Sequence, residues 1–530
     1  MFIIDIDKDI DKIKIEGDGM KKLIKMLFSR LFIVSILILL QAIILGIGIW
    51  KLSEYFVYLY VLFAVISMIV VVYILNKKEN PSYKLAWVIP ILLFPVFGGL
   101  FYLVFGGDKT SKKFKAAIQK AYENTKECLV QDDEILRELN DKDKSISNQF
   151  NYIKEYSSFP VYKNTETKYL SPGEEFFEVL KEELKKAKHF IFMEYFIVEE
   201  GIMWNSILDI LAQKAEEGVD VRVMYDDVGT IKTLPYKYHE KLQKLGIKTI
   251  VFNEIQPRLS LKMNNRDHRK ITVIDGYIGF TGGINLADEY INQRERFGHW
   301  KDAAIMLKGE AVRNLTIMFL QVWNFDKEGQ EDYDTYLDTT LYEKEFKDDG
   351  YVQPYADSPL DEEIIGENVY LNMIHKARDY VYINTPYLII DNELVTALTL
   401  AAKSGLDIRI VTPHIPDKWY VHLLTRAYYQ QLIEAGIKIY EYTPGFIHSK
   451  TFVADDELGV VGTINLDYRS LYLHFECGVL MYKSKAVLQI KEDFLKTLEV
   501  CLPVTLEECH NVRWHIRLMR SILRCFAPLM

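Results

Sequence analysis

The same short pattern of polar residues occurs twice in this chain. Each copy has a histidine, a lysine two positions later and an aspartate five positions after the lysine, namely His268, Lys270 and Asp275 in the first copy and His448, Lys450 and Asp455 in the second. A neutral imidazole can attack phosphorus, a protonated one can act as an acid, and a lysine can neutralise phosphate oxygens. The pattern therefore predicts a phosphodiester exchange through a covalent histidine intermediate.

Each copy is predicted to form a β-hairpin around its aspartate. In the first copy, apolar residues 270–274 and 277–280 are typical strands, and Asp275-Gly276 between them is a typical hairpin turn. A two-residue turn would place Gly283 opposite His268. The second copy, with residues 451–454 and 459–461, repeats the arrangement, so each hairpin brings an imidazole and an ammonium group to one edge.

Small and amide residues follow each hairpin and are predicted to bind the substrate phosphate. Small residues let backbone amides approach an anion, and asparagine adds a side-chain donor. These residues are Gly283 and Asn285 in the first copy and Thr463 and Asn465 in the second. A single pattern of this kind is more often the solvated end of a strand, but two copies with matching spacing and matching tails are not a coincidence.

Further matches between the two halves predict a duplicated domain. Residues 187–192 resemble 377–382, and residues 218–223 resemble 405–410. Helical stretches alternate with short apolar strands in each half, which is typical of an α/β fold. We expect two α/β domains with mixed or mostly parallel core sheets, packed so that the two histidine hairpins face each other.

The doubled motif resembles the phospholipase D superfamily, and the longer matches are similar to its bacterial cardiolipin synthases. The resemblance covers roughly residues 55–530 and rests on the segments 194–198, 223–227, 265–270, 298–302, 385–387, 440–442, 462–470 and 475–476. The chain departs from the usual pattern at Gly283, His299 and His474, where Ser, Tyr and Asn are common. None of these changes removes a group that the chemistry requires.

The resemblance also implies roles for individual residues. It implies that Asp302, after the first copy, and Glu476, after the second, orient the histidines; the alternative is an ordinary carboxylate at a strand end. His268 is favoured as the nucleophile and His448 as the acid and base. The aspartates in the two turns are interpreted as more structural than chemical. We expect no metal and no cofactor, because the lysines supply positive charge and no metal-ligand spacing is evident.

Uncharged stretches near the amino terminus predict an integral membrane protein. Residues 31–50, 56–75 and 87–105 are long apolar segments, and the first begins too late and is too long for a cleavable signal peptide. The expected organisation is a basic segment and membrane anchor, a charged helical linker, and two phospholipase D-like repeats, the second with a basic amphipathic end, at residues 1–107, 108–160, 161–345 and 346–530.

The side of the membrane that holds the catalytic part is ambiguous. Basic residues flank the anchor on both ends, and a fully spanning third segment would place the repeats outside the cytoplasm. Prolines and glycines in residues 90–99 allow a re-entrant or interfacial hairpin instead. The positive charges after residue 108 favour a cytoplasmic catalytic part. The expected location is therefore the bacterial cell membrane, with the chain as a multi-pass protein. The basic helix near residues 513–524 either lies on an anionic membrane or packs on the domain.

Composition narrows the function. The net charge of −10 argues against a general nucleic-acid binder, and the five cysteines, an odd number without tight spacing, are expected to be thiols. The sequence predicts a cardiolipin synthase-like transferase that uses phosphatidylglycerol, passes a phosphatidyl group through histidine and releases glycerol. Alternatives are hydrolysis by water, transfer to another acceptor such as phosphatidylethanolamine, a membrane-tethered nuclease, and a non-catalytic lipid-binding scaffold.

Overall fold

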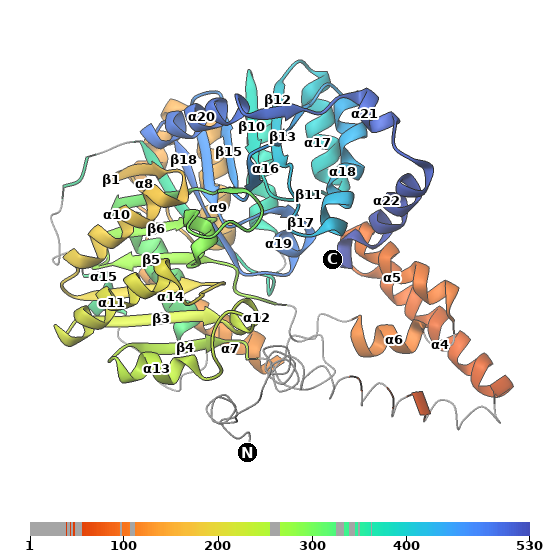
Figure 1. Cartoon of the computed structure of the whole chain (residues 1–530), viewed down its shortest axis with the longest axis horizontal. Coiled ribbons are helices and arrows are strands. Elements are labelled where there is room, and N and C mark those ends of the chain that lie inside the picture. Colours follow the sequence, from red (N-terminus) through yellow and green to blue (C-terminus); the bar gives the residue numbers. More distant parts are fainter. Residues whose placement is uncertain are drawn as a thin grey trace, which may run out of the picture.

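The computed structural model describes residues 56–95, 98–106, 112–254, 265–324, 333–338, 345–347, 350–361 and 363–529, together with residues 39, 43, 46 and 47. Each half of the chain builds one large β-sheet (Figure 1). The seven-stranded sheet runs in the order β1 (Thr165–Leu170), β8 (Ala304–Gly309), β6 (Ile278–Gly282), β5 (Lys270–Ile274), β2 (Phe190–Tyr195), β3 (Asp220–Asp226) and β4 (Lys248–Phe252). The eight-stranded sheet runs in the order β19 (Cys501–Pro503), β13 (Lys438–Tyr442), β12 (Asp407–Pro413), β10 (Tyr380–Asn384), β15 (Thr451–Ala454), β16 (Leu458–Gly462), β18 (Glu476–Tyr482) and β9 (Tyr351–Asp357).

The two sheets share an arrangement of six strands. The order β8-β6-β5-β2-β3-β4 in the first sheet corresponds to β18-β16-β15-β10-β12-β13 in the second. Strands β2, β3 and β4 are parallel to one another, as are β10, β12 and β13. The other three strands of each set, which include the motif hairpin, are antiparallel to their neighbours. The duplication is confirmed, and the sheets are mixed. The expectation of mostly parallel sheets is wrong, because a tight hairpin can join only antiparallel strands and each motif contributes one.

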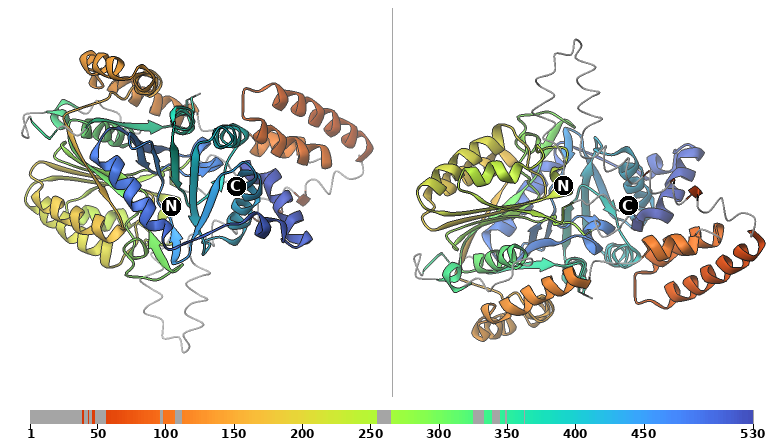
Figure 2. Two further views of the ribbon diagram at one scale, coloured as in Figure 1. Left: turned by 90° about the horizontal axis from the view of Figure 1, so that it is seen from above. Right: turned by 90° about the horizontal axis from the view of Figure 1, so that it is seen from below.

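The helices and sheets form five layers, with separate apolar clusters outside the first sheet, between the sheets and outside the second sheet. The outer face of the first sheet is covered by α10 (Gly173–Lys186), α11 (Ile202–Glu216) and α13 (Tyr238–Lys244). Between the two sheets lie α14 (Val312–Trp323) and α20 (Lys485–Leu498). The outer face of the second sheet is covered by α16 (Ile365–Lys376), α17 (Asn392–Lys403) and α18 (Trp419–Glu434). Figure 2 shows the yellow and green half packed beside the blue half, so that one inner face of each sheet turns toward the other half.

Both motif hairpins form, but their loops differ from the expected ones: the first is one residue longer, and the second is one residue shorter because β16 begins at Leu458. Strand β5 pairs with β6 so that Ile274 lies opposite Ile278, and β15 pairs with β16 so that Ala454 lies opposite Leu458. The loops therefore contain three residues, and the two-residue turn expected in the first copy is wrong. Asp275 and Gly276 both have positive φ, at 50° and 74°. An Asp-Gly pair suits either loop length, so the sequence did not distinguish them.

Short strands and a bridge join the two halves directly beside the motif histidines. Strand β7 (His299–Lys301) from the first half runs parallel to β14 (Gly445–Ile447) from the second. A bridge also pairs Asp267 with Phe475. A second small sheet, β11 (Leu388–Ile389) with β17 (Leu466–Asp467), lies within the second half. Segments from the two halves thus exchange backbone hydrogen bonds beside each histidine.

From residue 56 to the first repeat, the described residues form two groups of helices. The first contains α4 (Phe56–Asn76), α5 (Pro81–Leu93) and α6 (Gly98–Phe105), and the second contains α7 (Lys112–Thr125), η2 (Lys126–Cys128), α8 (Asp133–Lys142) and α9 (Lys144–Ser157). Among the described residues, no helix combines the length and the apolar character needed to cross a membrane. The expected segment 87–105 is divided between α5 and α6, and almost all of the expected segment 31–50 lies outside the described residues.

The chain ends in α21 (Leu506–His510), α22 (Trp514–Phe526) and η6 (Ala527–Leu529). Helix α22 packs against α18 and α5, so the carboxyl-terminal helix lies beside the amino-terminal helices (Figure 1). The predicted terminal helix is therefore present, and it contacts both the catalytic half and the predicted anchor region.

Candidate active site

His268 is held by a carboxylate from the opposite half of the chain. Its Nδ1 lies 2.9 and 3.0 Å from the two carboxylate oxygens of Glu476, the first residue of β18. Its backbone N–H donates to the carbonyl of Phe475 at 2.9 Å. The imidazole is therefore fixed through both its ring and its main chain, and its Nε2 is the nitrogen left for chemistry.

His448 has the reciprocal arrangement. Its Nδ1 lies 2.6 Å from Oδ2 of Asp302, a residue of the first half. Its backbone N–H donates to the carbonyl of Lys301 at 2.7 Å. Both histidine side chains are buried, with His268 8% and His448 7% exposed. The structure brings the two predicted histidines and their two predicted carboxylates together, but each carboxylate meets the histidine of the other copy.

Burial lowers the pKa of both histidines. The pKa of His268 falls to about 3 because burial disfavours the charged ring, although Glu476 partly opposes this. The pKa of His448 falls to about 4 because of burial and the nearby Lys450, with Asp302 opposing. These pKa values correspond to neutral rings at pH 7, which is the form required of a nucleophile.

The motif lysines lie beside their histidines and are almost fully buried. The ammonium of Lys270 donates to the carbonyl of His268, and that of Lys450 donates to the carbonyl of His448 and lies 2.9 Å from its Nδ1. Burial lowers the pKa of Lys270 to about 8 and that of Lys450 to about 7; neighbouring carboxylates oppose the shift in both cases. The positive charge beside each histidine is therefore sensitive to pH near neutrality.

Glu476 is the centre of a hydrogen-bond cluster that sequence reasoning found only in part. Besides His268, it accepts hydrogen bonds from the hydroxyls of Thr463 and Ser470. Burial would raise the pKa of this carboxyl, but His268 and His474 lower it below its ordinary value. Glu476 is therefore anionic at neutral pH. The neighbouring segment 462–470 carried the resemblance, but no spacing pointed to Ser470 as a partner of the carboxylate.

A third histidine lies in the same place. The Nδ1 of His474 is 3.8 Å from Oε1 of Glu476, and its ring centroid is 5.6 Å from that of His268. One donor atom each from His268, His474 and Glu476 lie within 4.8 Å of one another, a set of ligand types that can hold a divalent metal. The absence of a metal from the reaction stays a prediction.

The residues expected to bind phosphate have other contacts in this structure. The side-chain oxygen of Asn285 accepts from the Ile197 N–H at 3.0 Å, and its amide donates to Tyr290 at 2.8 Å. The hydroxyl of Thr463 is directed to Glu476. The Oδ1 of Asn465 is buried without a hydrogen-bond partner among the described residues. Phosphate binding by these side chains remains a prediction.

Gly283 lies against the carboxylate that orients His448. A Cβ atom at this position would approach Oδ1 of Asp302 to 2.1 Å, far inside van der Waals contact. Asp302 is itself fully buried and accepts from the backbone N–H of Ala303 at 2.8 Å. The glycine at this position, where the superfamily often has serine, therefore gives Asp302 the space it occupies.

The two aspartates of the motif turns bind backbone amides far from the imidazoles. Asp275 accepts from the N–H groups of residues 188–190 at 2.7 to 2.9 Å, and Asp455 accepts from those of residues 378–380 at 2.6 to 3.0 Å. These residues lead into β2 and β10, the central strands next to each hairpin. The contacts give both aspartates a structural role in joining the hairpin to the sheet.

Charged residues around the first motif form a buried network that the sequence did not reveal. The guanidinium of Arg269 lies 2.7 Å from Glu194 and 3.1 Å from Asp267, and all three side chains are buried. A second pair, Arg266 and Asp226, approaches to 3.4 Å. Arg269 belongs to the motif and Glu194 to a resembling segment, but spacing alone gave no sign that they pair. The second copy has Ser449 in place of Arg269.

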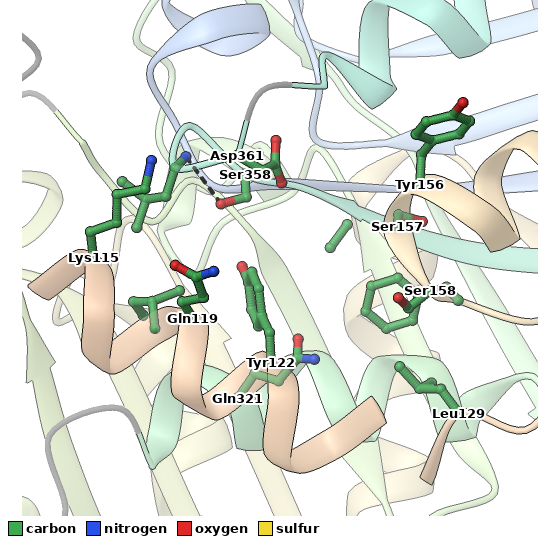
Figure 3. Close-up of a pocket in the computed structure, with 14 residues that line it drawn as sticks. Lys115, Gln119, Tyr122, Leu129, Tyr156, Ser157, Ser158, Gln321, Ser358 and Asp361 are labelled. Carbon is green, nitrogen blue, oxygen red and sulfur yellow. Dashed lines mark hydrogen bonds between the residues drawn. The ribbon is translucent and has the colours of Figure 1, made fainter. Parts of the chain in front are cut away.

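A cavity of about 430 Å³ lies apart from the histidines (Figure 3). It is lined by the linker residues Lys115, Gln119 and Tyr122 on α7, by Gln321 on α14, and by Asp361 after β9, among others. In Figure 3 the three linker side chains project from one helix toward this space. Its lining includes no residue of either motif, so it is separate from the candidate active site.

Two family profiles match the chain. One, described as the cardiolipin synthase, phospholipase D-like domain, matches residues 180–323 and 370–498. The other, described as the amino-terminal region of phospholipase D-nuclease proteins, matches residues 65–107. The first pair of matches includes both histidine motifs and all strands of the two large sheets except β1, β9 and β19.

Similar proteins extend over most of the chain. An uncharacterized protein of Streptococcus mutans is 46% identical over 87% of this chain and 99% of its own length. A cardiolipin synthase of Halalkalibacterium halodurans is 36% identical over 88% of this chain and 94% of its own length. Cardiolipin synthase 2 of Bacillus anthracis is 37% identical over 88% of this chain and 91% of its own length. The crystal structure of a phosphatidylserine synthase from Haemophilus influenzae shares the fold, with a TM-score of 0.53 and 15% identity over 72% of this chain and 97% of that one. The chain belongs to the family of bacterial cardiolipin synthases within the phospholipase D superfamily.

Proposed function

We propose that this protein synthesises cardiolipin from two molecules of phosphatidylglycerol. One phosphatidyl group is transferred to a histidine, passed to the second lipid, and glycerol is released. The observation that carries the proposal is the pair of buried histidines, each held by a carboxylate of the other half and each beside a buried lysine. Family membership supports phosphatidyl transfer as the reaction, since relatives named cardiolipin synthase match nearly nine-tenths of the chain.

In the first step, the neutral Nε2 of His268 attacks phosphorus while the bond to the glycerol oxygen breaks. His448, protonated at Nε2, gives its proton to that oxygen, so glycerol leaves as a neutral alcohol. Lys270 and Lys450 neutralise the phosphate oxygens in the transition state. The products of this step are a phosphatidyl group bonded to nitrogen and a neutral His448.

In the second step, His448 takes the proton from a hydroxyl of the second phosphatidylglycerol. The oxygen attacks phosphorus, the nitrogen–phosphorus bond breaks, and both histidines return to their initial states. His448 must be charged at the start of each cycle, whereas burial lowers its pKa to about 4. The phosphate anion of the substrate stabilises the imidazolium and raises this pKa.

Transfer to water is the main competing reaction, and transfer to another alcohol such as phosphatidylethanolamine is a further one. The low exposure of both histidines supports lipid transfer, because a site that excludes water favours an alcohol acceptor held by its own binding energy. The same phosphohistidine would serve all three acceptors. The nucleophile, the phosphate-binding roles of Asn285 and Asn465, and the acceptor are parts of this proposal.

We also propose that residues 1–107 attach the enzyme to the bacterial cell membrane, with the linker and both repeats, 108–160, 161–345 and 346–530, on the cytoplasmic side. The match of residues 65–107 to the amino-terminal profile supports attachment by this region. Apolar side chains on α4 are exposed, for example Tyr58, Ile69 and Val72 at 82%, 63% and 53%. Burial of such surface against lipid is favourable, and the substrate is itself a membrane lipid.

The test is reconstitution of the full chain in phosphatidylglycerol vesicles, followed by mass spectrometry of lipids and assay of glycerol. Cardiolipin and glycerol in equal amounts are expected from the wild type. Neither is expected from His268→Ala or His448→Ala, whose folding is checked by circular dichroism. Phosphatidic acid as the product would instead identify a hydrolase. Wild-type activity in either folded variant would overturn the two-histidine mechanism.

A further inference from the structure

Helix α22 leaves an apolar stripe uncovered at the end of the chain. Trp514, Leu518 and Ile522 follow one another at four-residue spacing and are 76%, 52% and 47% exposed. Cys525 lies on the same side of the helix and is also exposed. A helix in a soluble domain normally turns such a stripe toward its core.

The opposite side of α22 is anchored to the domain. Leu523 packs against the core of the second half, and Ala527, just after the helix, is only 2% exposed. The helix also packs against α18 and α5. The exposed stripe is therefore the outer surface of a docked helix and not the consequence of a frayed end.

Four arginines accompany the stripe; two of them have neutral partners, and a third, Arg520, is half-buried with its Nε lacking a hydrogen-bond partner among the described residues. The four are Arg513, Arg517, Arg520 and Arg524. Arg517 donates to the carbonyl of His510 at 2.9 Å, and Arg524 donates to Gln431 at 3.1 Å and lies over the ring of Tyr428. Within the described part of the chain, none of the four guanidinium groups forms an ion pair with a carboxylate. In a protein of net charge −10, this helix is a local concentration of positive charge.

Exposed apolar side chains also occur on α5, one of the amino-terminal helices, which packs against α22. Helix α5 contacts α22, and its Leu85, Leu92 and Leu93 are 56%, 56% and 67% exposed. Figure 1 shows α22 and α4–α6 on the same side of the molecule, away from the first sheet. The two ends of the chain thus combine an apolar surface with cations at its border.

We propose that α22 docks on the surface of an anionic lipid bilayer. In the docked state, Trp514, Leu518 and Ile522 enter the boundary between headgroups and acyl chains, and the arginines contact lipid phosphates. A bilayer fits better than a protein partner because α22 is cationic and packs against α5, a helix of the region proposed to be membrane-attached. The inference rests on the proposed function only for the choice of phosphatidylglycerol as the anionic lipid.

The consequence for the enzyme is a second attachment point. Helix α22 packs on α18, whose Tyr429 hydroxyl lies 2.6 Å from the Thr412 hydroxyl on β12. Docking at α22 would therefore fix the second catalytic half relative to the membrane, in addition to the attachment through α4–α6. Substrate would then approach from a membrane of defined orientation.

The test uses Cys525 as a native probe position. A nitroxide is attached to Cys525 in the full chain carrying Cys128→Ser and Cys501→Ser, and the protein is reconstituted in vesicles of phosphatidylglycerol. Collision rates with molecular oxygen and with a water-soluble nickel complex report lipid and water exposure, respectively. The control carries the label at Lys185→Cys on α10, in a background that also contains Cys525→Ser; Lys185 is exposed on the other half.

The label at Cys525 is expected to collide several-fold more with oxygen and several-fold less with nickel than the control label. Arg513→Gln with Arg517→Gln is expected to reduce this difference, whereas Lys186→Gln with Lys188→Gln, two exposed lysines beside the control label, leaves it unchanged. Equal access of nickel to both labels would overturn the proposal. Protection of Cys525 from both reagents would also overturn it, because that result indicates contact with protein.

Cardiolipin synthesis measured in the same vesicles separates this inference from the proposed function. Activity with a water-exposed Cys525 label would overturn the docking of α22 and leave the function standing. A lipid-exposed label without cardiolipin would support docking and overturn the function.

Discussion

Lys450 and Lys270 are each only 1% exposed, and this burial lowers their pKa values to about 7 and about 8. An ammonium group with a lowered pKa is charged below that pKa and neutral above it. The phosphate clamp should therefore weaken as pH rises through this range, although an ordinary lysine would stay charged to about 10.5. The environment of the two side chains, and not their type, sets the working pH of the site.

We predict that kcat/KM for phosphatidylglycerol falls as pH rises through about 7 to 8. The measurement is a pH profile of cardiolipin formation in vesicles. Lys450→Arg, which keeps its charge at high pH, should move the descending limb upward. A wild-type profile that stays flat until the ordinary lysine range would contradict this explanation.

At the scale of elements, the network of Arg269, Glu194 and Asp267 ties the first motif to β2. Removing one partner from a buried ion pair leaves an uncompensated charge, which costs about 3–5 kcal/mol. We therefore predict that Arg269→Ala lowers the free energy of unfolding by about that amount, measured by denaturant unfolding of the detergent-solubilised protein.

The duplicated fold offers a matched control, since Ser449 occupies the equivalent position and has no such partners among the described residues. Ser449→Ala should change stability by less than about 1 kcal/mol, and equal effects of the two substitutions would count against the network.

Sequence patterns predicted the hairpins because a hairpin is specified by residues close together in the sequence, namely the apolar strand residues and the turn residues between them. Strands 270–274 and 451–454 have the expected bounds. The sequence did not give the loop length, because Asp275-Gly276 tolerates positive φ in loops of two or three residues. The sequence predicted mixed or mostly parallel sheets, and the hairpins account for part of the mixed outcome; the order of the remaining strands depends on which non-local strands lie beside the hairpins. The buried partners of Arg269 and the hydroxyls around Glu476 are likewise set by packing between distant segments.

For the whole molecule, the central feature is that neither half holds a complete set of catalytic groups. The motif repeat predicted two histidines in one site, and resemblance supplied Asp302 and Glu476. The exchange of carboxylates between halves follows from the pairing of β7 with β14 and of Asp267 with Phe475. These contacts join residues far apart in the chain, so no local pattern could have indicated them.

The exchange predicts which histidine each carboxylate controls. Asp302→Asn should shift the ring-nitrogen resonances of His448 and leave those of His268 nearly unchanged, and Glu476→Gln should do the reverse. Histidine-selective nitrogen NMR measures both, with assignments from the His268→Ala and His448→Ala variants. Each carboxamide variant should also lose about tenfold to 100-fold in turnover, because a neutral partner orients the ring less well. A shift in the histidine of the same copy as the mutated carboxylate would contradict the crossed arrangement.

The most direct test of the account is to trap the covalent intermediate. Wild-type enzyme turning over phosphatidylglycerol labelled in its phosphate would be quenched in base, which preserves phosphohistidine, and its peptides analysed by mass spectrometry. The account predicts a phosphatidyl group, or the phosphate derived from it, on the peptide that contains His268, and its absence from His268→Ala. Label confined to His448 would reverse the two roles. Cardiolipin formation with no label on either histidine would contradict the central claim that the two halves build one site for covalent phosphatidyl transfer.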